Sequence, residues 1–191
     1  LRKNRTYPIS VFGKHNLSNM KAAMLVCKKL GIDEDAFLMA ISDFTGAAKR
    51  LELIHEEEGF IVYKDFAHAP SKCKATIAAV RQKFARKKIR AILELHTFSS
   101  LSNEFIQQYR GTMDEADQAY VFYDPHALEM KKMAPIDDEN LVDSFAHKAF
   151  TLITTPQEMS SAIGSAKADG VDVLLLMSSG NMGGINPLEL L

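Results

Sequence analysis

The spacing of apolar residues changes along this chain and predicts helices first. Apolar positions recur every three or four residues over 17–30 and stop before Gly31, a common helix C-terminal residue. A second helix is expected over residues 35–44, with Asp33 as its N-cap. A short apolar run at residues 7–12 predicts a strand ahead of both helices. The opening part of the chain is therefore predicted to be strand, helix, helix.

Strands and helices alternate over the rest of the chain. Two strand runs, at residues 51–56 and 60–64, surround Gly59 and predict a hairpin. Further helices are expected near residues 71–84, 103–110, 138–146 and 156–167, and further strands near 89–95, 119–123, 150–153 and 171–177. This alternation predicts an α/β fold, a three-layer Rossmann-like domain with a mostly parallel sheet and an N-terminal hairpin strand. The small residues at 45–48 suggest a boundary between domains at 1–47 and 48–191.

Composition narrows the class of protein only a little. With 47% hydrophobic and 25% charged residues the chain is typical of globular proteins. A net charge of -1 argues against a nucleic-acid partner, and no apolar run is long enough to span a membrane. Two cysteines give no disulfide framework, which favours the cytoplasm. Because the chain opens on Leu1 without a Met, we expect it to begin inside a longer polypeptide.

Polar residues follow four of the predicted parallel strands. Ligands of open parallel sheets bind beyond the carboxyl ends of the strands, which meet at one edge. The residues in question are Asp65 and His68; His96, Thr97, Ser99 and Ser100; Asp124 and His126; and Ser178, Ser179 and Asn181. Turn and cap chemistry explains several of them, Asp65 among these. It explains less well why three of the chain's six histidines stand at strand ends, so we favour a functional edge.

The sequence lacks the motifs of several common kinds of site. The sequence contains no Cys-x-x-Cys pair for zinc, no Gly-x-Ser-x-Gly nucleophile turn and no Walker phosphate loop. Residues 178–184 form a glycine-rich loop after a buried strand, whose spacing differs from the dinucleotide fingerprint. Its backbone amides suit an anion, and a plain turn fits the same residues equally well.

Three ordered motifs carry a family resemblance. They are the segment Gly13-Lys14-His15-Asn16-Leu17-Ser18-Asn19, the isolated Arg50, and Asp65-Phe66-Ala67-His68-Ala69-Pro70. Together they resemble the Mur ligase family, ATP-dependent enzymes that join amino acids or peptides to UDP-N-acetylmuramate in peptidoglycan synthesis. The first segment is similar to the end of the family's central ATP-binding domain, and the other two to the start of its C-terminal domain.

The resemblance implies half of an ATP site. His15 and Asn19 would contact the adenine, Arg50 the phosphates and Asp65 the ribose. The phosphate loop, the Mg²⁺ ligands and the UDP-sugar domain would lie outside these residues, in the remainder of the same polypeptide. We therefore expect a C-terminal fragment that is inactive alone and holds no certain catalytic residue. Many family members carry a second acidic residue where this chain has Lys64, so the resemblance does not extend to a carboxylate pair at this position.

The acceptor substrate is a finer question. Residues 94–100 and 177–181 are most similar to the branch that joins the murein tripeptide L-alanyl-γ-D-glutamyl-meso-diaminopimelate to UDP-N-acetylmuramate in peptidoglycan recycling. This implies a peptide-binding edge made of His68, His96, Thr97, Ser99, His126, Ser179 and Asn181. Two alternatives stay open: a ligase of the same family that adds L-alanine or another amino acid, and a nucleotide- or peptide-binding module without catalysis.

Overall fold

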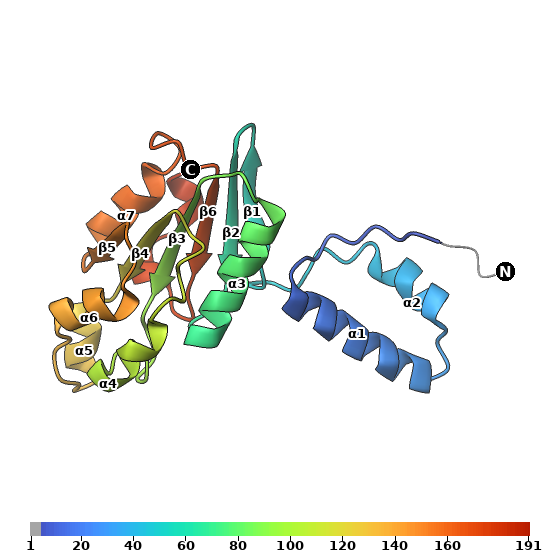
Figure 1. Ribbon diagram of the computed structural model, residues 1–191, viewed down its shortest axis with the longest axis horizontal. Helices are drawn as coiled ribbons and strands as arrows, with labels where there is room; N and C mark the ends of the chain where they lie inside the picture. Colours follow the sequence, from blue (N-terminus) through green and yellow to red (C-terminus); the bar gives the residue numbers. More distant parts are fainter. Residues whose placement is uncertain (1–4) are drawn as a thin grey trace.

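A computed structural model describes residues 5–191 as a sheet domain with a small helical lobe beside it (Figure 1). The lobe (residues 5–44) contains α1 (Lys14–Lys29) and α2 (Glu34–Ile41). As predicted, Asp33 caps α2 by accepting a hydrogen bond from Ala36 N at 2.8 Å. The strand predicted at residues 7–12 was wrong, because the structure has no strand there. A joint (residues 45–51) connects the lobe to the sheet domain (residues 52–191).

The sheet domain contains six strands in the order β1-β2-β6-β3-β4-β5. Its first two strands form an antiparallel hairpin, and every other pairing in the sheet is parallel. This confirms the predicted α/β fold. The strands are β1 (Glu52–Glu57), β2 (Phe60–Asp65), β3 (Ile89–Glu94), β4 (Gln118–Phe122), β5 (Phe150–Ile153) and β6 (Val173–Met177).

Helices cover both faces of this sheet (Figure 1). One face packs against α3 (Pro70–Lys83), α4 (Asn103–Ile106), α5 (Pro125–Met130) and α6 (Asp138–Phe145), and the other packs against α7 (Pro156–Gly164). Residues 5–191 also form three short 3₁₀ turns, η1 (Gln107–Tyr109), η2 (Met182–Gly184) and η3 (Pro187–Glu189). Strand β6 lies at the centre, with Leu175 and Met177 in one core and Leu174 and Leu176 in the other. The result is the expected three-layer arrangement.

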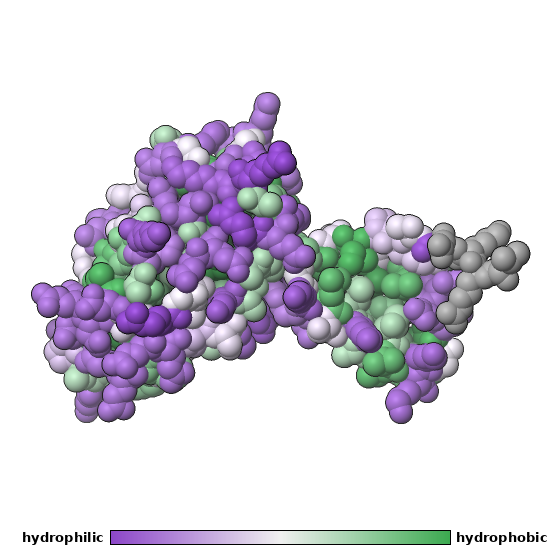
Figure 2. Space-filling model, viewed as in Figure 1, coloured by the Kyte–Doolittle hydropathy of each residue, from purple (hydrophilic) through white to green (hydrophobic). Residues whose placement is uncertain are grey.

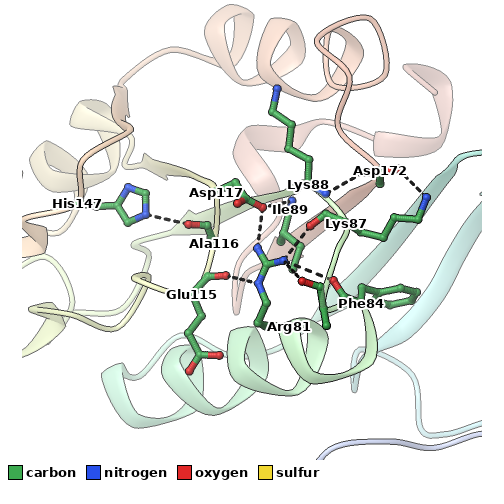
Figure 3. A network of polar contacts seen from close by, with 11 residues as sticks. Arg81, Phe84, Lys87, Lys88, Ile89, Glu115, Ala116, Asp117, His147 and Asp172 are labelled. Atoms are coloured by element: carbon green, nitrogen blue, oxygen red, sulfur yellow. Dashed lines mark hydrogen bonds and ion pairs between the residues drawn. The ribbon is translucent and has the colours of Figure 1, made fainter.

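Two aspartates hold the start of β3, at the amino-end edge of the sheet (Figure 3). Asp117 accepts hydrogen bonds from Ile89 N at 2.7 Å and from the Arg81 guanidinium at 2.6 Å. Asp172 accepts one from Lys88 N at 2.7 Å. This edge is therefore occupied by structural contacts, which leaves the carboxyl edge as the candidate for ligands.

The contacts of Asp172 make the stability of the fold depend on pH in acid. The Lys87 ammonium and the backbone N–H of Lys88 lower the pKa of Asp172 in the folded protein. Its contribution to stability is therefore complete above the unfolded pKa of about 3.9 and is lost as the pH falls through the lower, folded value. We expect urea unfolding to show wild type more stable than Asp172→Asn at pH 6, with the difference shrinking below about pH 4. A difference that stays constant from pH 6 to pH 2.5 would contradict this assignment.

The lobe exposes much apolar surface. Within the described chain none of the residues of α1 is buried, and α2 buries only Phe37. Leu30 is 76% exposed, Met39 61% and Val26 58%, and Figure 2 shows apolar surface spread over the lobe. Continuous apolar surface on a small lobe is typical of a face that another protein surface covers. No described helix is long and apolar enough to cross a membrane.

Candidate functional site

A cleft of about 680 Å³ lies where the lobe meets the sheet domain, between α1 and α3. It is lined from α1, from the joint, from the first two turns of α3 and from the end of β2. The four residues predicted to bind ATP all line it: His15, Asn19, Arg50 and Asp65. Residues up to 50 positions apart in the sequence are thus brought together at one site.

The α1 wall combines polar and apolar side chains. His15 and Asn19 are four residues apart and lie on one face of the helix, next to the apolar Met20 in the cleft wall. Gly13 lets the start of α1 approach α3 closely, because a Cβ at this position would lie 2.6 Å from the Cβ of Ala79. Donor and acceptor groups beside an apolar wall suit a flat heteroaromatic ring such as a nucleobase.

The opposite side of the cleft carries positive charge. Arg50 extends from the joint, with its guanidinium carbon 5.7 Å from the centre of the Phe66 ring. Lys72 lies in the first turn of α3, a helix of 14 residues whose N-terminus faces the cleft. A helix N-terminus, a lysine and an arginine together favour phosphate groups.

Asp65 forms part of the cleft floor. Its side chain is only 4% exposed. One carboxylate oxygen accepts a hydrogen bond from Leu51 N at 2.8 Å, and the other accepts from Ala67 N at 2.7 Å and from the Thr76 hydroxyl at 3.3 Å. The carboxylate is therefore held by the protein itself. Its contact with ribose stays a prediction.

A second polar cluster lies at the carboxyl edge of the central strands. Glu94, at the end of β3, is 3% exposed and accepts hydrogen bonds from the Ser178 hydroxyl and from Met182 N, the latter at 3.0 Å. Ser178 accepts in turn from Gly180 N at 2.8 Å. His96 lies above, with Nδ1 4.0 Å from Glu94 Oε1. Glu94 thus orders the glycine-rich loop. Ser178 was expected at this edge, whereas Glu94 was not named among the site residues, although a charged residue ending an apolar strand was a visible signal.

The other predicted edge residues differ in what surrounds them. Ser179 Oγ is buried and has no hydrogen-bond partner in the part of the chain that the structure describes. The Thr97 hydroxyl is 2.9 Å from the Ser100 hydroxyl, which stabilises the turn after β3. Ser99 and Asn181 lie close to the cluster residues in the sequence, and both are exposed to solvent. Neither side chain makes a hydrogen bond within residues 5–191.

Two of the three strand-end histidines do not join this cluster. His68 Nδ1 is 2.9 Å from the carbonyl oxygen of Phe66, and its own carbonyl accepts a hydrogen bond from the Tyr109 hydroxyl. His126 is exposed on α5, 3.5 Å from Glu129. Among the described residues no hydrogen bond or ion pair links either histidine to His96, and the role expected for all three at the ligand edge stays a prediction.

Metal and thiol chemistry find little support in the described residues. Across residues 5–191 no group of three His, Cys, Asp or Glu side chains is placed to hold a metal ion. Burial raises the pKa of Cys73 to about 12, so this thiol stays protonated and unreactive. The polar groups present are suited to binding and orienting a ligand.

A mostly parallel sheet whose carboxyl edge opens into a cleft against a second lobe defines an α/β domain of the ligand-binding type. The chain belongs to the Mur ligase family, because the family described as "Mur ligase, glutamate ligase domain" matches residues 49–180. The match covers the joint after Ala48 and the sheet through the end of β6. The resemblance found in the sequence motifs is thereby confirmed at the level of the family.

Two of the relatives are UDP-N-acetylmuramate–alanine ligases. The chain is 35% identical over 133 residues to the UDP-N-acetylmuramate–L-alanine ligase of Caldicellulosiruptor bescii, covering 70% of this chain and 29% of that protein. In fold it is similar to the UDP-N-acetylmuramate–alanine ligase of Thermotoga maritima, with a TM-score of 0.67, 21% identity and coverage of 91% and 36% of the two chains. The chain thus spans about a third of the length of these relatives.

Two further solved structures share the fold. A murein peptide ligase from Psychrobacter arcticus has a TM-score of 0.62 at 21% identity, with 93% of this chain and 36% of that chain covered. The MurF ligase from Thermotoga maritima, solved in complex with ADP, has a TM-score of 0.62 at 19% identity, covering 93% and 38%. The fold is therefore common to family members that use different acceptors.

Proposed function

We propose that this chain is the part of an ATP-dependent amide ligase of peptidoglycan synthesis that closes over ATP and positions the amine substrate. The observation that carries the proposal is the cleft between α1 and α3, which gathers His15, Asn19, Arg50 and Asp65. A family member of the same fold was solved with ADP, which supports a nucleotide as the ligand.

Each wall of the cleft has a role in this proposal. His15 and Asn19 pair with the edge of the adenine, while Arg50 and Lys72 bind phosphate oxygens. When bound, ATP supplies the phosphoryl group that activates the lactyl carboxylate of UDP-N-acetylmuramate. The residues of this chain bind and orient the substrates and exclude water from the site. The amine then attacks the activated carboxyl group from a position that binding has already fixed. No step is assigned to Mg²⁺, since residues 5–191 offer it no ligand cluster.

The amine substrate is proposed to bind beside the nucleotide, at the Glu94 cluster. The two sites adjoin, because Ser178 N donates a hydrogen bond to the carbonyl of Asp65 at 3.0 Å. A buried carboxylate next to His96 attracts an ammonium group. Ser179, whose buried hydroxyl has no partner among residues 5–191, follows Ser178 in the same loop. Thr97, Ser99 and Asn181 border this cluster in the sequence. His68 and His126 are left out of the proposal.

The identity of the acceptor has two candidates. L-Alanine is favoured by the relative at 35% identity. The murein tripeptide is favoured by residues 94–100 and 177–181, whose motifs resemble the tripeptide-adding branch. Both assign the same cleft to ATP and differ only in what binds at the Glu94 cluster.

Ligation assays with the full-length gene product test the proposal. We expect amide formation from ATP, UDP-N-acetylmuramate and one of the two acceptors, with release of ADP and phosphate. Turnover with L-alanine selects the first candidate, and turnover with the tripeptide alone selects the second. Absence of ligation with either acceptor, by a protein that still binds ATP, would contradict the ligase function and favour a binding module without catalysis.

A further inference from the structure

Two left-handed residues flank Arg50 in the joint. Lys49 has a φ of 56° and Leu51 a φ of 46°. Residues with a Cβ, leucine among them, seldom adopt this left-handed region of φ, because the Cβ crowds the following carbonyl oxygen. Such a conformation persists where surrounding contacts hold it, and it clusters at functional sites.

The holding contacts come mainly from the end of β2. Leu51 N donates to the Asp65 carboxylate at 2.8 Å, and Phe66 N donates to the carbonyl of Lys49 at 2.8 Å. On the other side, Lys49 N donates to the Glu52 carboxylate at 2.8 Å. Hydrogen bonds therefore hold the backbone immediately before and immediately after Arg50.

Asp65 can hold this backbone because the sheet holds Asp65. It ends β2, which pairs with β1 on one side and with β6 on the other. Its second oxygen is engaged by Ala67 N and by the Thr76 hydroxyl at 2.7 and 3.3 Å. Since the side chain is 4% exposed, water competes little for these hydrogen bonds.

We propose that Asp65 is a positioning residue for Arg50: its carboxylate holds Leu51 in a left-handed conformation, which directs the guanidinium into the cleft. Asp65 then acts on the nucleotide through Arg50. The consequence for ATP rests on the proposed function, whereas the effect on the backbone of the joint does not. The two parts are tested separately.

Asparagine at position 65 is the sharpest change available. It keeps the shape of aspartate and replaces one acceptor oxygen by an NH₂ group, which cannot accept from Leu51 N or Ala67 N. One of these two buried N–H groups then lacks its partner. The matched control is Asp172→Asn, since Asp172 also accepts a backbone hydrogen bond, from Lys88 N at 2.7 Å, at the opposite edge of the sheet.

Limited trypsin digestion of the 191-residue chain measures directly how easily the backbone of the joint opens, because trypsin cleaves after both Lys49 and Arg50. With peptides quantified by mass spectrometry, Asp65→Asn is expected to raise cleavage after these two residues about tenfold or more, as local opening becomes easier. Cleavage after Lys87 and Lys88 should stay unchanged. Asp172→Asn should show the reverse pattern.

Two results would overturn the role of Asp65 in the joint. One is an unchanged cleavage rate after Lys49 and Arg50 in Asp65→Asn. The other is an equal increase at Lys87 and Lys88, which indicates general unfolding. If Asp65→Asn does not fold, Thr76→Val serves instead, since it removes a side-chain hydrogen bond that holds the Asp65 carboxylate and should raise cleavage in the joint severalfold. An unchanged rate in that variant would overturn the proposal as well.

ATP titrations test whether Asp65 affects ATP binding through Arg50. Asp65→Asn should weaken ATP binding by about the same factor as Arg50→Gln, roughly tenfold, and the double variant should be no weaker than Arg50→Gln. Losses that add in the double variant would contradict action through Arg50. If Arg50→Gln alone has no effect, the proposed nucleotide role of Arg50 fails, while the trypsin result still decides whether Asp65 holds the joint.

Discussion

Replacing Arg50 by glutamine is expected to lower the affinity of the chain for ATP by about tenfold or more. A charge-assisted hydrogen bond to phosphate contributes about 1.5–3 kcal/mol, and Arg50 supplies the only guanidinium among the residues that line the described cleft. Glutamine keeps part of the length and polarity but loses the charge and the forked donor geometry. Calorimetric or NMR titration with ATP measures the effect.

Arg86→Gln provides the matched control for this prediction. Arg86 is exposed after α3, outside the residues that line the cleft. Its replacement removes the same charge from the chain and should leave ATP affinity within about twofold of wild type, since distant exposed charges are screened by salt. Equal losses in both variants would show that net charge matters and the cleft does not.

Replacing Gly180 by alanine is expected to disrupt the second cluster. A Cβ at this position would lie 2.7 Å from His96 Cγ and 2.8 Å from Glu94 Oε2, closer than a carbon atom can approach either group. His96 or the loop must move, at a cost of about 1–3 kcal/mol in folding stability. Thermal unfolding of the chain should show a melting temperature several degrees lower. Ligation by the full-length gene product should fall by about tenfold or more, because misplacing groups beside the reacting amine is costly.

Gly164→Ala is the control for the effect of the added methyl group. A Cβ there would meet only the carbonyl of Leu190, at an ordinary distance of 3.6 Å. This variant should keep the melting temperature and the ligation rate of wild type. Normal stability and ligation in Gly180→Ala would remove the Glu94 cluster from the proposed amine site, while leaving the nucleotide cleft unaffected.

The sheet was predictable because its apolar runs are bounded by turn residues and separated by helical patterns. β5 occurs at the predicted residues, and α3 begins one residue earlier than predicted. The run at residues 7–12 failed as a strand for a tertiary reason: a strand needs a neighbour to accept its hydrogen bonds, and the described lobe contains only helices. Pro8 within that run also lacks a donor. Helix α5 was not among the expected helices, since Asp124-Pro125 can begin a turn as well as a capped helix.

The site residues that belong to sequence motifs could be predicted. Those whose role depends on contacts with residues far away in the sequence could not. His15, Asn19, Arg50 and Asp65 were each visible in a motif, and the cleft brings them together. Glu94 gains its role from Ser178, 84 residues away, so no local pattern reveals the pair. In the same way, the sequence marks Asp65 as a polar strand-end residue but does not indicate that its carboxylate holds Leu51.

The central claim is that the cleft between α1 and α3 binds ATP, and an NMR titration of the ¹⁵N-labelled chain with ATP tests it most directly. We expect weak, saturable shifts of the amides of His15, Asn19, Arg50 and Lys72, which are smaller in Arg50→Gln, and no magnesium-dependent ATP turnover by the 191-residue chain. Shifts that are absent at millimolar ATP, or confined to residues outside this cleft, would contradict it.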